Sequence, residues 1–148
     1  MNTIARRAAN GAAAGALAAG VWAAQQPLDK RIFRSRYDDV ELLGKLASRG
    51  RAWPAAGTAM HLANGAGFGA AYALAGRSLP GPGYVRGLLA AMAENFGSWP
   101  LVGLIDRHHP ARAELETLSG NRRALAQATW RHAIFGITLG AIEARLDA

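Results

Sequence analysis

The chain of 148 residues contains no cysteine, so neither disulfide bonds nor thiolate metal sites contribute to its stability. It also lacks the motifs of several large enzyme classes: there is no Gly-x-Ser-x-Gly, no phosphate-binding P-loop and no dinucleotide-binding fingerprint. The basic segments contain few aromatic residues and no recognisable nucleic-acid-binding module, and we expect no nucleic-acid partner. These absences leave enzyme activity open, but nothing in the sequence favours it.

Charge is distributed unevenly along the chain. Seventeen Lys and Arg residues outnumber ten Asp and Glu residues, and the formal net charge is +7. Most of these charges lie between long stretches that carry almost none. Because about 20 largely apolar residues can cross a bilayer as a helix, the stretches predict membrane spans near residues 8–28, 53–76, 84–105 and 122–145. Only Glu94 and Arg131 interrupt their uncharged centres.

The predicted fold is an all-α, four-helix transmembrane bundle in which residues 1–148 form a single membrane-embedded domain. Ala and Gly are abundant in the predicted spans, so their hydropathy is modest for membrane helices. A soluble Ala-rich bundle is one alternative, although the 53–76 stretch has few polar side chains for a solvated face. A second alternative is that the first stretch is a cleaved signal peptide, because a basic start and an apolar run precede small residues near Trp22.

The first connector, residues 29–52, predicts a short amphipathic helix. Pro27 is expected to end the preceding helix, because the residue before a proline is driven out of helical geometry. Apolar residues from Val40 to Ala47 then recur at helical spacing, and Ser35 is a candidate cap. This pattern indicates an interfacial helix on the membrane surface or, equally, a solvated linker helix.

Basic residues are concentrated in the connectors 29–52 and 106–121 and at the start of the last stretch, with eleven Lys and Arg there against five on the opposite side. Basic loops tend to stay in the cytoplasm, so we predict a multi-pass protein of the inner (plasma) membrane with both connectors cytoplasmic. The four tryptophans, at positions 22, 53, 99 and 130, lie near span ends on that side, as in an interfacial aromatic belt. The expected partners are the bilayer, with anionic lipid head groups at the basic connectors, and a homo- or hetero-oligomer.

The two halves of the chain share a pattern that indicates an internal repeat of one helical hairpin. The matched residues are Trp22 and Asp29 with Trp99 and Asp106, and His61, Gly65 and Gly69 with His132, Gly136 and Gly140. Glycines four residues apart lie on one helix face and let a neighbouring helix approach closely. We expect such helix packing at Gly11, Gly15, Gly65, Gly69, Gly136 and Gly140.

His61 and Glu94 are the central pair of a predicted buried polar site. Ionisable side chains within membrane spans are costly and usually face the interior of the bundle. Counted inward from the tryptophan level at about 1.5 Å per residue, Glu94 and His61 lie near enough in depth to meet across adjacent helices. Asn64 shares the His61 face and His132 lies nearby, so the four residues predict a site that binds or conducts a proton or a small ligand.

Other interpretations of the same residues stay open. The polar groups could be a clamp that locks helix pairing, in a non-catalytic accessory or assembly protein of a membrane complex. His61, His132 and Glu94 could ligate a metal ion, or the two histidines could ligate haem. No HExxH, ExxH or CxxCH motif supports either ligand, and we expect no cofactor and no metal.

The pattern resembles the small four-helix inner-membrane proteins of uncharacterised function found in bacterial genomes. The resemblance is carried by the Ala/Gly-rich spans and by the segments His61-Leu62-Ala63-Asn64-Gly65, Trp99-Pro100-Leu101 and Gln127-Ala128-Thr129-Trp130-Arg131-His132. It covers most of the chain. It implies a membrane location and no particular activity.

Overall fold

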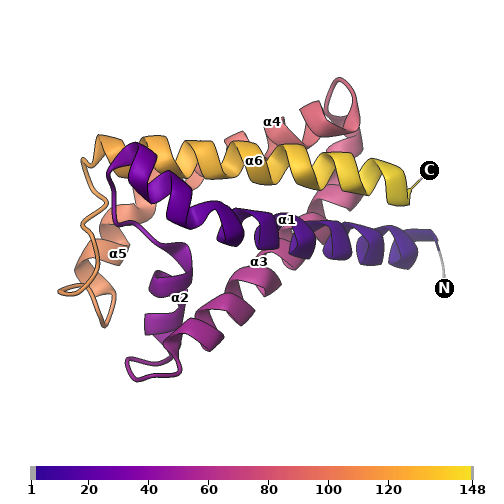
Figure 1. Cartoon of the computed structure of the whole chain (residues 1–148). Coiled ribbons are helices and arrows are strands. Elements are labelled where there is room, and N and C mark those ends of the chain that lie inside the picture. The colour runs from indigo at the N-terminus through magenta and orange to yellow at the C-terminus, as the bar shows by residue number, and fades with distance from the viewer. Residues whose placement is uncertain (1–2, 148) are drawn as a thin grey trace.

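The computed structural model describes residues 3–147, the side chain of Arg77 excepted, and over that range the chain forms helices and no strands (Figure 1). The elements are α1 (Thr3–Phe33), α2 (Asp39–Ala47), α3 (Trp53–Ala75), the 3-10 turn η1 (Gly76–Ser78), α4 (Gly83–Ser98), the 3-10 turn η2 (Trp99–Leu101), α5 (Val102–His108) and α6 (Arg122–Leu146). The helical content agrees with the predicted all-α class. The predicted domain, 1–148, includes residues 1, 2 and 148, which lie outside the described range.

Helices α1 and α6 run side by side in opposite directions, so that both ends of the chain lie at one end of the molecule (Figure 1). The Asn10 side-chain amide donates to the Leu146 carbonyl oxygen at 2.9 Å and to Asp147 Oδ1 at 3.1 Å. The expectation that Pro27 ends the first helix is wrong, because α1 continues to Phe33. The turn that follows Pro27 is joined to α6 by the buried ion pair of Asp29 with Arg131.

Glycines form two close helix crossings, one between α1 and α3 and one between α4 and α6. A Cβ added to Gly15 would lie 2.0 Å from the carbonyl oxygen of Gly65, and one added to Gly87 would lie 2.1 Å from that of Gly136. The residues at the crossings are Gly11 and Gly15 with Gly65 and Gly69, and Gly83 and Gly87 with Gly136 and Gly140. The six glycines expected to pack helices therefore all lie where two backbones touch.

The short helix α2 lies in the first connector, where the sequence predicted one, but a different residue caps it. Asp38 is the N-cap and accepts from the Glu41 backbone N–H at 3.0 Å. Ser35 instead donates its hydroxyl to Glu116 Oε2 at 3.0 Å, which ties the first connector to the last. Gly44 brings α2 onto the start of α3, because a Cβ there would lie 2.1 Å from the Trp53 carbonyl oxygen.

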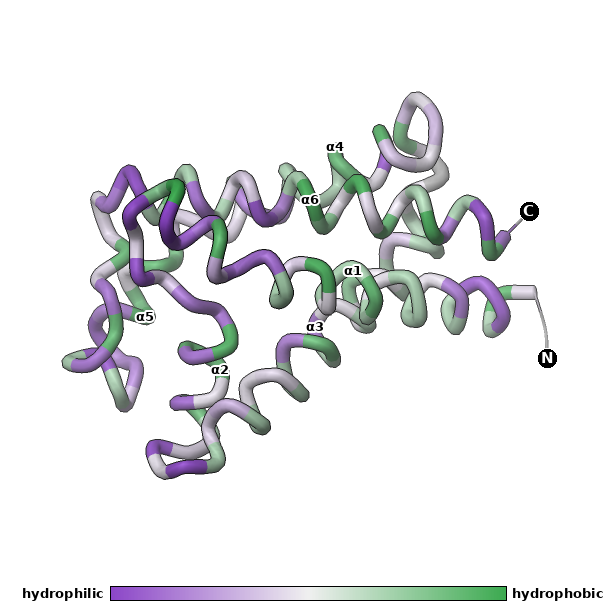
Figure 2. Tube along the Cα trace, viewed as in Figure 1, coloured by the Kyte–Doolittle hydropathy of each residue, from purple (hydrophilic) through white to green (hydrophobic). Residues whose placement is uncertain are grey.

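The connectors before α3 and before α6 meet at the end of the molecule opposite the termini, where Figure 2 shows many hydrophilic residues. Lys45 on α2 pairs with Glu114 at 2.9 Å. The ring of His109 accepts from the Ala111 N–H through Nδ1, so its Nε2 carries a hydrogen and donates to the Leu42 carbonyl oxygen at 3.0 Å. These contacts hold α2 against the loop that precedes α6.

The four-helix transmembrane bundle predicted from the sequence is wrong. Within residues 3–147, a single helical stretch, Gly83–His108, is long and apolar enough to cross a membrane, and little of it is buried. In the other stretches, the Gly faces at the helix crossings pack against neighbouring backbones, and such small residues contribute little apolar surface. Helices α1 and α6 also bury charged residues against each other.

The internal repeat is not supported either. Trp22 lies within the continuous helix α1 and is only 6% exposed, whereas Trp99 begins η2, where Pro100 interrupts the helix. Asp29 is fully buried in α1, while Asp106 on α5 accepts two backbone N–H groups of the loop that follows. The matched Trp and Asp residues thus occupy unlike environments. The aromatic belt is incorrect for Trp22, which is buried and cannot lie at an interface.

Candidate ligand-binding cleft

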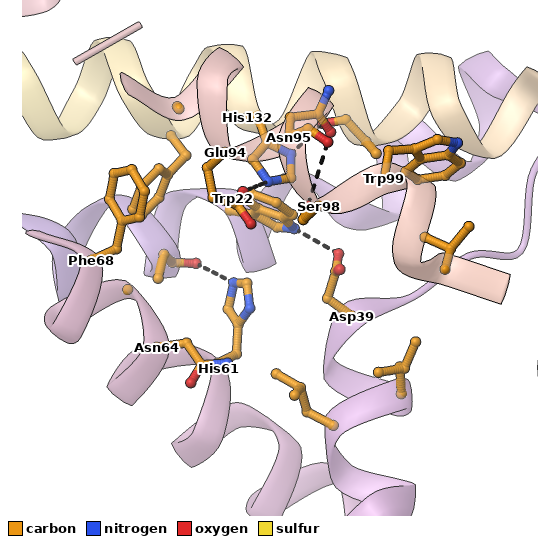
Figure 3. A pocket seen from close by; sticks show the side chains of 18 of the residues that line it. Trp22, Asp39, His61, Asn64, Phe68, Glu94, Asn95, Ser98, Trp99 and His132 are labelled. Atoms are coloured by element: carbon orange, nitrogen blue, oxygen red, sulfur yellow. Dashed lines mark hydrogen bonds and ion pairs between the residues drawn. The ribbon is translucent and has the colours of Figure 1, made fainter. Parts of the chain in front are cut away.

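A cleft of about 810 Å³ opens between α3 on one side and α4, η2 and α5 on the other (Figure 3). Helices α3 and α4 are each held by their own glycine crossing, to α1 and α6 respectively, and they diverge from the Pro-Gly turn that joins them (Figure 1). Helices α1 and α6 form the floor of the cleft between them. Its walls are largely apolar and include Phe68, Leu101, Leu104 and Ile105.

Trp22 lies at the centre of the floor, between two histidines. Its indole contacts the His61 ring at a centroid distance of 5.3 Å and the His132 ring at 4.7 Å, both edge to face. The indole N–H donates to Asp39 Oδ2 at 3.0 Å. Because Trp22 is nearly fully buried and hydrogen-bonded, its ring has one defined position and fixes the distance between the two imidazoles.

His132 and Glu94 form an ion pair that requires an additional proton. His132 Nε2 lies 2.7 Å from Glu94 Oε2, and His132 Nδ1 lies 2.8 Å from the Ala128 carbonyl oxygen. A carbonyl oxygen only accepts, so Nδ1 must carry a hydrogen. The contact at Nε2 then needs a second hydrogen, either on the imidazole or on the carboxyl group. The pair therefore holds one proton more than a neutral imidazole beside a carboxylate.

The predicted pairing of His61 with Glu94 is wrong. His61 Nε2 lies 3.2 Å from the Ala19 carbonyl oxygen and donates to it, which leaves Nδ1 as an acceptor. Glu94 pairs with His132 instead, because α4 crosses α6 and not α3. Burial lowers the pKa of His61, and so this imidazole is neutral at pH 7.

All four predicted site residues line the cleft, and two neighbours that the prediction missed line it as well. Asn64 is exposed on the α3 wall, in line with its place on the His61 face. Asn95 is 1% exposed and donates its amide to Thr129 Oγ1 at 3.1 Å. Asp39 holds the Trp22 indole at the edge of the floor. In the sequence, the position of Asn95 directly after Glu94 was the feature that could have indicated its place in the site.

A buried ionic network lies beneath the floor. Arg131 on α6 is fully buried; its Nε donates to Asp29 Oδ2 at 2.6 Å and its Nη2 donates to Asp29 Oδ1 at 2.7 Å. Its Nη1 donates to Asp39 Oδ2 at 2.8 Å, and its Nη2 also reaches the Tyr37 carbonyl oxygen at 3.0 Å. Gln127 donates to Asp29 Oδ1 at 2.6 Å. The sequence signal was the isolated Arg131, but nothing in the sequence linked it to Asp29.

The network sets the protonation of its own members. Burial alone would lower the pKa of Arg131, but its bonds to the Asp29 and Asp39 carboxylates raise it, so the guanidinium stays charged. Burial raises the pKa of the Tyr37 phenol well above its usual value, and the Asp39 carboxylate, 2.5 Å from the hydroxyl, raises it further. Tyr37 is thus a neutral donor to Asp39.

The floor does not have the geometry of a haem or metal centre. The Trp22 indole occupies the space between His61 and His132, and both Nε2 atoms already contact oxygen atoms of the chain. Over the part of the chain that the structure describes, no three His, Asp or Glu side chains are grouped to hold a metal ion.

Comparison of the chain with models of protein families, with curated proteins and with solved structures gives no match.

Proposed function

We propose that this protein is a membrane-associated binder of a small, largely apolar ligand, which occupies the cleft with its polar end at His61, Glu94 and His132. The observation that carries the proposal is the cleft of about 810 Å³ itself. Ligand sites are commonly clefts of about 300–1,000 Å³ with apolar walls and a few converging polar groups. The cleft matches this description, since its walls are largely apolar and its polar side chains His61, Glu94 and His132 come together beside Trp22.

A membrane setting is supported by the stretch Gly83–His108, which forms one wall of the cleft and is long and apolar enough to enter a bilayer. Leu89 and Phe96 on this stretch are exposed, and contact with lipid would remove their apolar surface from water. Arg107 and Arg112 lie at its α5 end, where they can meet anionic lipid head groups. A ligand dissolved in the bilayer would then enter the cleft along this wall.

Gly67 offers a direct test of the cleft. It lines the cleft on α3, and a Cβ added there would meet no atom within 4 Å. Gly67→Phe is therefore expected to fill the cleft without disturbing the fold. Gly97→Phe on α4 is the matched control, because Gly97 has the same free space around an added Cβ and does not line the cleft.

The experiment measures binding of the apolar fluorophore N-phenyl-1-naphthylamine to the purified protein. The wild type and Gly97→Phe are expected to give saturable fluorescence enhancement, and Gly67→Phe is expected to lose it. Equal saturable binding by both variants would show that the fluorophore binds outside the cleft and would contradict the proposal. Fractionation checks the membrane setting separately: release from membranes by buffer or high salt without detergent would exclude insertion of Gly83–His108.

A further inference from the structure

We infer that the natural ligand is a single-chain amphiphile with a primary ammonium head group, which rests on the floor of the cleft beside Glu94. This inference depends on the proposed ligand-binding function and adds the chemical class of the ligand. It follows from counting which hydrogen-bonding atoms of the floor are already engaged. The free atoms on this floor are predominantly acceptors.

Glu94 and His61 each turn an acceptor toward the cleft. The Glu94 side chain is 42% exposed although one of its oxygens pairs with His132, so the carboxyl group is within reach of a ligand. His61 uses Nε2 to donate to the Ala19 carbonyl oxygen, and its Nδ1 presents a lone pair. Figure 3 shows both side chains on the cleft, on either side of Trp22.

Asn95 adds a buried acceptor that has no partner. The Thr129 hydroxyl donates its hydrogen to the Leu125 carbonyl oxygen at 2.8 Å, and it can then only accept from the Asn95 amide nitrogen. This assigns the orientation of the Asn95 amide and leaves Oδ1 as the free atom. That oxygen is buried and has no hydrogen-bond partner. A buried acceptor without a partner costs about 1–3 kcal/mol, which a donor on the ligand would offset.

The donors of the floor, in contrast, are already used. The Trp22 indole N–H donates to Asp39, and the His132 ring faces the Glu94 and Ala128 oxygens. The Arg131 guanidinium points away from the cleft into Asp29, Asp39 and the Tyr37 carbonyl group. An anionic head group beside Glu94 would therefore meet mainly acceptors, because the Asn64 amide donor lies on the α3 wall. A fatty carboxylate is disfavoured on this account.

Charge and aromatic rings favour a cation at the same place. Beneath the floor, the two carboxylates of Asp29 and Asp39 face the one guanidinium of Arg131, and this buried cluster carries one net negative charge. The aromatic rings of Trp22 and Phe68 line the cleft, and aromatic rings attract a nearby ammonium group. A primary ammonium has three N–H donors for the free acceptors, whereas a quaternary ammonium has none.

The experiment compares four probes that share a ten-carbon chain: decylamine, decanol, decanoate and decyltrimethylammonium. Each displaces N-phenyl-1-naphthylamine from the protein in nanodiscs of zwitterionic lipid at pH 7. Decylamine is expected to displace the fluorophore at a concentration roughly tenfold or more below decanoate and decyltrimethylammonium, as for one charge-assisted hydrogen bond. Gly67→Phe nanodiscs, measured alongside, correct for partition of each probe into lipid.

Glu94→Gln keeps the size of the side chain and removes its charge, so decylamine is expected to lose most of its advantage over decanol. Glu41→Gln is the control, because Glu41 lies on α2 outside the cleft and pairs with Lys45. Equal displacement by decylamine, decanol and decanoate in the wild type would overturn the head-group inference and leave the cleft function intact. No displacement by any probe, with no effect of Gly67→Phe, would overturn both. The wild-type series decides the inference even if Glu94→Gln does not fold.

Discussion

Arg131 and Asp29 are 102 residues apart in the chain and form a two-pronged ion pair in which neither side chain is exposed to solvent. The pair joins the last turns of α1 to the first half of α6 directly beneath the cleft. The same guanidinium also donates to Asp39, and Asp39 in turn accepts from the Trp22 indole N–H. The position of the cleft floor therefore depends on a charge cluster of which Asp39 alone, of its charged members, lines the cleft.

Asp29→Ala is expected to lower the free energy of unfolding by about 3–5 kcal/mol, because it leaves the buried Arg131 charge incompletely compensated. The double variant Asp29→Leu with Arg131→Met should recover much of that loss, since it removes both charges. Glu41→Ala, which breaks the Glu41–Lys45 pair between residues of one helix, should cost less than about 1 kcal/mol. Chemical denaturation followed by circular dichroism measures all three. An Asp29→Ala protein as stable as Glu41→Ala would contradict the structural role of the network.

Gly15→Ala tests the α1–α3 crossing. The new Cβ would lie 2.0 Å from the backbone oxygen of Gly65, so the helices must separate, at a cost of about 1–3 kcal/mol. Gly97→Ala is the control, because a Cβ at position 97 would meet no atom within 4 Å. The better helix propensity of alanine should there raise the free energy of unfolding by up to about 1 kcal/mol. Opposite shifts of the melting temperature are expected. A Gly15→Ala protein that melts no lower than the wild type would show that the crossing is not close-packed.

Glu114 gives a pH dependence with a defined sign. Its hydrogen bonds to Arg49 and Lys45 lower its pKa from 4.5 to about 2. A carboxyl group with a depressed folded-state pKa contributes stability above its unfolded value, and this contribution is lost as the pH falls from about 4.5 toward 2. The melting temperatures of the wild type and Glu114→Gln should therefore differ at pH 7 and converge near pH 2. If the difference in melting temperature between the two proteins stays constant from pH 7 to pH 2, ionised Glu114 does not contribute to stability.

His132 is expected to carry hydrogen on both ring nitrogens. In ¹⁵N NMR spectra, both nitrogens should bear hydrogen while the ring contacts Glu94 and the Ala128 carbonyl oxygen. His61 should show a single hydrogen on Nε2, as its contact with the Ala19 carbonyl oxygen requires. Glu94→Gln should leave His132 with its hydrogen on Nδ1 alone. A His132 ring that carries hydrogen only on Nε2 in the wild type would contradict the geometry.

Sequence reasoning located most of the helices and four polar residues of the cleft. The predicted span 53–76 corresponds to α3 and the span 122–145 to α6. Capping and helix propensity act between residues close in sequence, and four-residue glycine spacing places its members on one helix face. These local rules explain why the glycine crossings and the short helix in the first connector could be anticipated.

The prediction of four membrane spans was wrong because absence of charge has two causes that look alike in a sequence. Lipid-facing helices lack charge because they contact hydrocarbon, and closely packed Ala/Gly helices lack it because a backbone occupies the same space. At Gly15 and Gly65, it is the neighbouring backbone that excludes side chains. Composition alone does not distinguish these causes. The helix axes had to be placed before either could be assigned.

The sequence by itself determined that this chain is helical, where its close-packing glycines lie, and which polar residues are exceptional in apolar surroundings. Only the tertiary structure decided how those polar residues pair: Glu94 with His132, His61 with the Ala19 carbonyl group, and Arg131 with Asp29. The reason is physical. Helix formation and face periodicity arise from neighbours within a turn or two, whereas a buried charge pairs with whichever group the crossing of two helices brings within about 3 Å.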